Sequence, residues 1–88
     1  PKYFMLKEKI NLSPSLDVDK ILKKIAEKYS NEKVDLVDGV RIDFIDCWVQ
    51  LRKSNTEPII RIYSEAASKE KARALIGEVE DLIKKIIN

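Results

Sequence analysis

Two stretches with apolar residues at helical spacing enclose a central region in which apolar and polar residues alternate. In residues 17–29 the apolar side chains recur three and four positions apart, and this spacing returns from residue 72 to the C-terminus. The segments between them alternate as half-buried strands do and are separated by turn-forming residues. Because an amphipathic helix must cover an apolar surface, a chain with both periods is expected to lay its helices on a sheet. The pattern therefore predicts an α+β fold.

The order of the predicted elements is β-α-β-β-β-β-α, which indicates a two-layer domain with a mainly antiparallel sheet and both helices on one face. Asp38-Gly39 is expected to be a two-residue hairpin turn, because both residues tolerate positive φ. Gly77, inside the second helix, weakens that helix and indicates close packing at this point. The predicted ranges are strands at 3–10, 34–37, 40–44, 47–51 and 59–63, and helices at 17–29 and from Ser68 to the C-terminus.

The composition excludes several kinds of site. The chain has 17 basic and 15 acidic residues, a net charge of +2, which argues against a basic nucleic-acid-binding arm. A single cysteine, Cys47, and the absence of histidine exclude an internal disulfide, a zinc site and a Cys-His or Ser-His dyad. Cys47 is interpreted as strand packing, because no base flanks it. The acidic residues are spread over a helix start and hairpins, so no metal site is expected in this chain.

No apolar run approaches the roughly 20 residues that a membrane helix needs, and the N-terminus lacks a signal peptide's organisation. We therefore expect a cytoplasmic protein with neither a membrane nor a nucleic-acid partner. The chain opens on a strand-like stretch without an initiating methionine. Residues 1–88 are accordingly expected to be one domain cut from a longer protein.

A polar connection joins the last two predicted strands. It reads Arg52-Lys53-Ser54-Asn55-Thr56-Glu57-Pro58-Ile59-Ile60-Arg61-Ile62-Tyr63. Its guanidinium, ammonium, amide and hydroxyl groups all bind anionic oxygen, and a loop held by two strands is a good place for a binding site. Strand alternation predicts that Arg52 and Arg61 share the face opposite the core. The connection therefore has the groups of a phosphate site.

This run resembles the phosphate-binding loop in the C-terminal domain of the α-D-phosphohexomutases, the phosphomannomutase and phosphoglucomutase family. The resemblance extends over most of the chain, and the loop is its most specific part. The family's C-terminal domain is described in the same terms as the fold predicted above, and the resemblance implies a TATA-box-binding-protein-like arrangement. The surrounding matches are Asp38-Gly39-Val40-Arg41-Ile42, Trp48-Val49 and Ser64-Glu65-Ala66, followed by a long amphipathic helix.

The resemblance also implies roles for individual residues. Asn55 makes the loop more similar to the phosphomannomutase/phosphoglucomutase branch than to the phosphoglucosamine branch. Lys53 stands where the family usually has proline, and it either adds a flexible positive charge or marks a less stiff loop. Glu57 either orients Arg52 or Arg61 without contacting the phosphate itself, or is a solubilising turn residue. The positions implied to contact the substrate phosphate are Arg52, Ser54, Asn55, Thr56 and, beyond the loop, Arg61.

The resemblance implies a parent enzyme that moves a phosphoryl group between the 1 and 6 positions of a hexose through a phosphoserine, Mg²⁺ and a bisphosphorylated intermediate. The serine, the metal ligands and the sugar-selecting loop would lie in other domains. This chain would then bind the non-reacting phosphate and be inactive alone, with the phosphorylated hexose and the remaining domains of the parent as its partners. Two other classes stay open: an α+β module that binds RNA or a protein, and a packing domain without a ligand.

Overall fold

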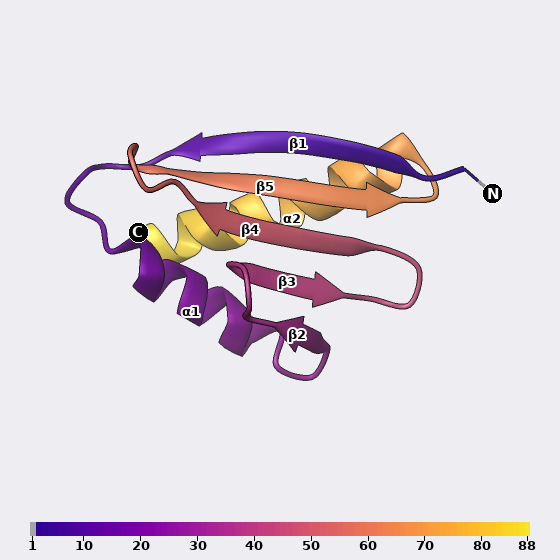
Figure 1. Ribbon diagram of the computed structural model, residues 1–88, viewed down its shortest axis with the longest axis horizontal. Coiled ribbons are helices and arrows are strands. Elements are labelled where there is room, and N and C mark those ends of the chain that lie inside the picture. Colours follow the sequence, from indigo (N-terminus) through magenta and orange to yellow (C-terminus); the bar gives the residue numbers. More distant parts are fainter. Residues whose placement is uncertain (1) are drawn as a thin grey trace.

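The computed structural model describes residues 2–88. It contains one antiparallel sheet with the strand order β1-β5-β4-β3-β2, and both helices pack on the same face of it (Figure 1). The predicted two-layer α+β arrangement is therefore confirmed. The elements are β1 (Phe4–Asn11), α1 (Val18–Lys28), β2 (Lys33–Asp35), β3 (Val40–Asp43), β4 (Trp48–Lys53), β5 (Ile59–Ala66) and α2 (Lys69–Ile87).

Both helices begin at a capping side chain. The Asp17 carboxylate accepts a hydrogen bond from the Lys20 amide at 3.2 Å, and the Ser68 hydroxyl accepts one from the Lys71 amide at 3.1 Å. Each cap satisfies one of the amides that a helix leaves unpaired in its first turn. The apolar stripe of each helix is turned to the sheet, and its buried members are Ile21, Leu22 and Ile25 in α1 and Ala72, Leu75, Ile76, Val79 and Ile83 in α2.

The sheet contributes every second residue of its central strands to the core. These residues face the helices, whereas their neighbours in sequence lie on the opposite face, which we call the open face. Strand alternation therefore gives the sheet an apolar side and a polar side, as predicted. The buried residues of the central strands that belong to the core are Val40, Ile42, Val49, Leu51, Ile60 and Ile62.

The connection between β2 and β3 differs from the predicted two-residue turn. Strand β2 ends at Asp35, so residues 36–39 form the connection. The Asp35 carboxylate accepts a hydrogen bond from the Val37 amide at 2.8 Å, and this local bond ends the strand early. Within residues 2–88, positive φ occurs at Gly39 alone, at +70°, so Asp38 does not use the positive φ that it was expected to tolerate. Strands β4 and β5, in contrast, run further than predicted, to Lys53 and Ala66.

The two glycines have opposite surroundings. A Cβ atom at Gly39 would lie 2.1 Å from the Leu51 carbonyl oxygen, so the turn approaches the backbone of β4 too closely for any side chain. A Cβ atom at Gly77 would meet nothing within 4 Å. The prediction that Gly77 marks close packing is therefore wrong, whereas Gly39 is required by both its φ and its neighbour.

We expect Gly39→Ala to lower the free energy of unfolding by about 2 kcal/mol or more, because the left-handed conformation alone costs a non-glycine residue roughly 1–2 kcal/mol and the Leu51 carbonyl must also move. Gly77→Ala is the matched control. It should raise the free energy of unfolding by roughly 0.5–1 kcal/mol, the usual gain at a helix interior. Urea unfolding followed by circular dichroism measures both, and equal effects of the two substitutions would contradict this account of Gly39.

Candidate functional site

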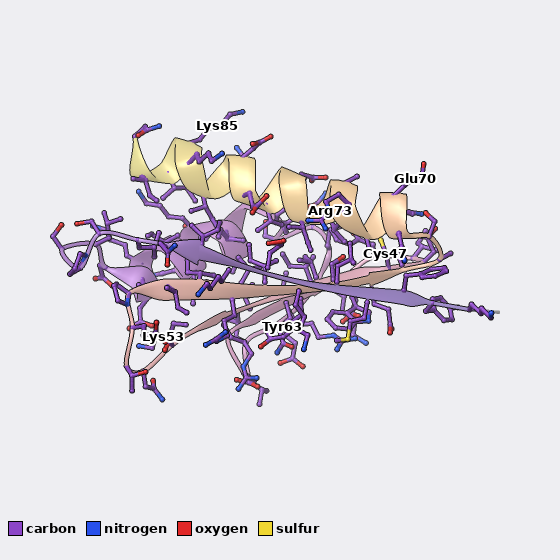
Figure 2. All side chains as sticks on the ribbon, turned by 90° about the horizontal axis from the view of Figure 1, so that it is seen from above. Cys47, Lys53, Tyr63, Glu70, Arg73 and Lys85 are labelled. Atoms are coloured by element: carbon purple, nitrogen blue, oxygen red, sulfur yellow. The ribbon has the colours of Figure 1, made fainter. Side chains whose placement is uncertain are left out.

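The polar turn, residues 54–58, lies at the end of the sheet where β1 and β4 finish and β3 and β5 begin. Figure 2 shows the turn that follows Lys53 extending to the side of the sheet away from α2. The Leu12 amide donates to the Pro58 carbonyl at 2.7 Å and so joins the turn to the end of β1. Arg52 and residues 55–58 are exposed. The turn is therefore open to a ligand and is not covered by a helix.

Arg52 and Arg61 lie directly opposite each other in the β4–β5 register. Both are exposed on the open face, as strand alternation predicted. Directly paired residues of antiparallel strands have Cα atoms about 4.5–5.5 Å apart, and like charges in such a pair repel. An anion that bound between the two guanidinium groups would remove this repulsion.

The Ser54 hydroxyl organises the turn itself. It accepts hydrogen bonds from the Thr56 amide at 3.3 Å and from the Glu57 amide at 3.2 Å, and it lies 3.4 Å from the Thr56 hydroxyl. This is the local side-chain-to-backbone bonding that favours serine in turns. The structure therefore brings the Ser54 and Thr56 hydroxyls together at the tip of the two strands.

A groove of about 870 Å³ runs between α1 and this end of the sheet. Asn55, Arg52 and Lys53 contribute to its wall. Asn55 thus lies on the α1 side of the turn, whereas Arg61 lies on the open face. The residues that the sequence assigned to one site surround the turn, and Arg52 is the one that borders both the groove and the open face.

Lys53 and Glu57 have surroundings that the sequence did not show. Lys53 lies opposite Ile60 and therefore on the helix face, where its Nζ is 2.9 Å from the Asp19 carboxylate of α1. Its charge is thus directed to the start of α1, away from the open face. In the described part of the chain, the Glu57 carboxylate makes no ion pair with either arginine. The proposed orienting role of Glu57 stays a prediction.

Asp38 lies beside this site, although the sequence pattern assigned it no contact with the phosphate-binding residues. Its carboxylate lies 3.2 Å from Arg52 Nε. The turn is held in place because the Gln50 side chain donates to the Asp38 carbonyl at 2.8 Å and Gly39 lies against the Leu51 carbonyl. Asp38 thereby occupies the Nε side of the guanidinium. The signal that could have found it is strand alternation, which places Arg52 on the open face beside the turn that precedes β3.

Other reactive chemistry receives little support from the structure. Burial raises the pKa of the Cys47 thiol, and the negative charge of Asp46 raises it further. A thiol with a raised pKa stays protonated and is a weak nucleophile. Among residues 2–88, no group of three or more histidine, cysteine, aspartate or glutamate side chains could hold a metal ion. None of the helices in this part of the chain has the length and apolarity needed to span a membrane.

A protein-family model matches most of this chain. The family model described as "Phosphoglucomutase/phosphomannomutase, C-terminal domain" matches residues 7–82. A phosphoglucosamine/phosphogalactosamine mutase of Sulfurisphaera tokodaii is 45% identical over 85 residues, which are 94% of this chain and 19% of the relative. A phosphoglucomutase/phosphomannomutase of Thermococcus kodakarensis is 48% identical over 75 residues, which are 83% of this chain and 16% of the relative. The chain thus spans about a fifth of the length of these curated relatives.

A solved structure has the same fold. The crystal structure of a phosphoglucomutase/phosphomannomutase family protein from Burkholderia thailandensis superposes with a TM-score of 0.68 at 22% sequence identity. The match covers 97% of this chain and 18% of that protein. The arrangement of the sheet and helices therefore recurs as one part of a larger protein.

We expect Asp38→Asn to loosen the Arg52 side chain without unfolding the protein. The pair is exposed, with 49% of the Arg52 side chain and 62% of the Asp38 side chain accessible, so its contribution to stability is about 1 kcal/mol or less. A neutral amide would hold Nε less firmly than the carboxylate does. ¹⁵N relaxation of the Arg52 Nε–H group measures the change.

Asp43→Asn is the matched control, because Asp43 pairs with Arg41 at 3.1 Å on the neighbouring strand. It should leave Arg52 Nε–H unchanged. If both substitutions changed the mobility of Arg52 equally, or if neither did, the positioning role of Asp38 would be disproved.

Proposed function

We propose that this chain, which belongs to the phosphoglucomutase/phosphomannomutase family as its C-terminal domain, binds the non-reacting phosphate of a phosphorylated hexose at the polar turn. The observation that carries the proposal is the direct pairing of Arg52 with Arg61 on an exposed face. Two guanidinium groups at this spacing repel each other and form charge-assisted hydrogen bonds to phosphate oxygens. The turn beside them adds the Ser54 and Thr56 hydroxyls and the Asn55 amide as donors.

The contacts around the turn support this role. Asp38 takes one side of the Arg52 guanidinium and leaves its terminal nitrogens for the ligand. The Ser54 hydroxyl holds the backbone of the turn in one conformation, so little freedom remains to be lost when a phosphate binds. The exposure of residues 55–58 lets a phosphorylated sugar approach the end of the sheet at which the turn lies.

We further propose that the parent enzyme interconverts hexose 1-phosphate and hexose 6-phosphate. The two relatives compared above are both named as mutases, of an amino sugar phosphate in one case and of a hexose phosphate in the other. Their names fall in both branches, so Asn55 as a marker of the branch stays a prediction. The remaining domains of the parent would supply the phosphoserine and the sugar-selecting loop, and residues 1–88 alone would be inactive.

Mg²⁺ belongs to this proposal as a group bound by the other domains of the parent, where it would stabilise the charge of the transferred phosphoryl group. The contribution of this chain is positional. A phosphate held at one end of the sugar presents the other end to the reacting centre, and such positioning supplies much of the catalysis of phosphoryl transfer. The cytoplasmic location expected from the sequence stays a prediction.

In the parent enzyme, Arg52→Ala should lower kcat/KM by about tenfold or more, because a charge-assisted hydrogen bond contributes roughly 1.5–3 kcal/mol. The same substitution in residues 1–88 should weaken glucose 6-phosphate binding to a similar degree, measured by titration calorimetry. Arg73→Ala is the matched control, since Arg73 is an exposed arginine of α2 that pairs with Glu8 at 3.3 Å on the helix side (Figure 2). Near-normal kinetics for Arg52→Ala would refute the assignment of the turn.

A further inference from the structure

The open face of the sheet has two parts with different charge balance. Toward the beginning of β4, Arg41 lies 3.1 Å from the Asp43 carboxylate and 4.2 Å above the ring of Trp48. Trp48 in turn donates its Nε1–H to the Glu65 carboxylate at 3.1 Å. Positive and negative groups in this part therefore satisfy one another.

The part of the open face between β1 and β5 carries positive charges that no carboxylate balances. Lys9 lies opposite Arg61 in the register, and Lys7 lies opposite Tyr63. All three cations are exposed, and among residues 2–88 none of them is within ion-pairing distance of an acidic side chain. Because Arg61 also faces Arg52, the row Lys9, Arg61 and Arg52 crosses three adjacent strands.

These cations surround a shallow hollow of about 230 Å³ lined by Lys7, Glu8, Lys9, Arg61 and Tyr63. The Glu8 carboxylate is directed to the other side of the sheet, where it lies 3.3 Å from Arg73 of α2. Figure 2 shows Arg73 beside α2 and Tyr63 on the opposite side. The side chains that face the hollow are therefore two ammonium groups, one guanidinium group and a phenol hydroxyl. All of them donate hydrogen bonds.

We propose that this hollow is a second phosphate-binding site, which takes the dianionic phosphate group of orthophosphate or of a phosphate monoester. Its volume is below the roughly 300 Å³ at which pockets for larger organic ligands begin, so it suits a small anion. A dianion there accepts charge-assisted hydrogen bonds from both strands and relieves the repulsion between Lys9 and Arg61. Arg61 is shared with the site proposed at the turn, whereas Lys7, Lys9 and Tyr63 lie outside that site and distinguish the hollow from it.

The test is a titration of residues 1–88 with orthophosphate and, separately, with glucose 6-phosphate, each compared with sodium chloride at the same ionic strength. NMR signals of the Lys7 and Lys9 amides and of the Tyr63 ring report on the hollow, because these residues take no part in the site proposed at the turn. We expect at least one phosphate probe to shift these signals to saturation, and chloride to leave them nearly unchanged. Saturation by orthophosphate alone would assign the hollow to free phosphate, and saturation by both probes to phosphate groups in general.

Charge substitutions identify the hollow as the place of binding. Lys9→Gln should lower the affinity for the phosphate probe that reaches saturation by about three- to tenfold, as expected for one charge-assisted contact at an exposed site. Lys9→Arg should preserve binding. Lys85→Gln makes the same change of charge on the far side of α2 and should have no effect (Figure 2). Equal effects of Lys9→Gln and Lys85→Gln, or equal shifts with phosphate and chloride, would overturn the proposal.

Repeating the titration in Arg52→Ala separates this site from the polar turn. The signals of the hollow should still saturate in that variant, while the amides of residues 54–57 lose their response. If the hollow no longer responded in Arg52→Ala, its shifts would have come from binding at the turn, and the second site would be refuted. If the hollow responded and the turn did not respond even in the unsubstituted chain, the function proposed for the turn would fail and the second site would stand.

Discussion

The antiparallel register between β4 and β5 is the constraint on which both the core and the candidate site depend. It pairs Leu51 with Ile62 on the helix side and Arg52 with Arg61 one residue later on the open face. Because side chains alternate along a strand, a slip of either strand by one residue would turn its arginine toward the apolar core and its apolar residue toward water. Burial of a charged group without a partner is far more costly than the loss of one core contact. The core therefore enforces the geometry of the site.

The turn between β2 and β3 adds a second constraint, because it contacts the neighbouring strand β4 at Arg52. Gly39 lets the backbone of the turn approach the Leu51 carbonyl, and the Gln50 side chain fastens the Asp38 carbonyl to the same strand. Asp38 then stands beside Arg52 Nε. An exposed ion pair of this kind contributes little to stability, so its consequence is the direction in which the guanidinium points. The connection between β2 and β3 thus orients a residue of the site that the sequence assigns to β4 and β5.

The sequence predicted those features that depend on local periodicity. Strand alternation identified the face of Arg52 and Arg61, and helical spacing identified the stripe of each helix. Several features that the sequence missed depend on a side-chain contact that periodicity does not encode. Asp35 ended β2 early by accepting a hydrogen bond from a backbone amide, and the partners of Lys53 and Asp38 required the strand register and the position of α1. Those partners are set by tertiary packing, which no local pattern of one chain specifies.

A sheet covered on one face alone explains how unbalanced charge is tolerated on the other. Like charges at about 4 Å repel by only about 1 kcal/mol in water, and salt reduces this further. Burial of one valine, leucine or isoleucine side chain contributes about 1.5–3 kcal/mol. The inner faces of β4 and β5 carry Val49, Leu51, Ile60 and Ile62, all fully buried. The apolar side of these strands therefore outweighs the repulsion on their polar side, so the same two strands can hold the fold together and present Arg52 and Arg61 side by side on the open face.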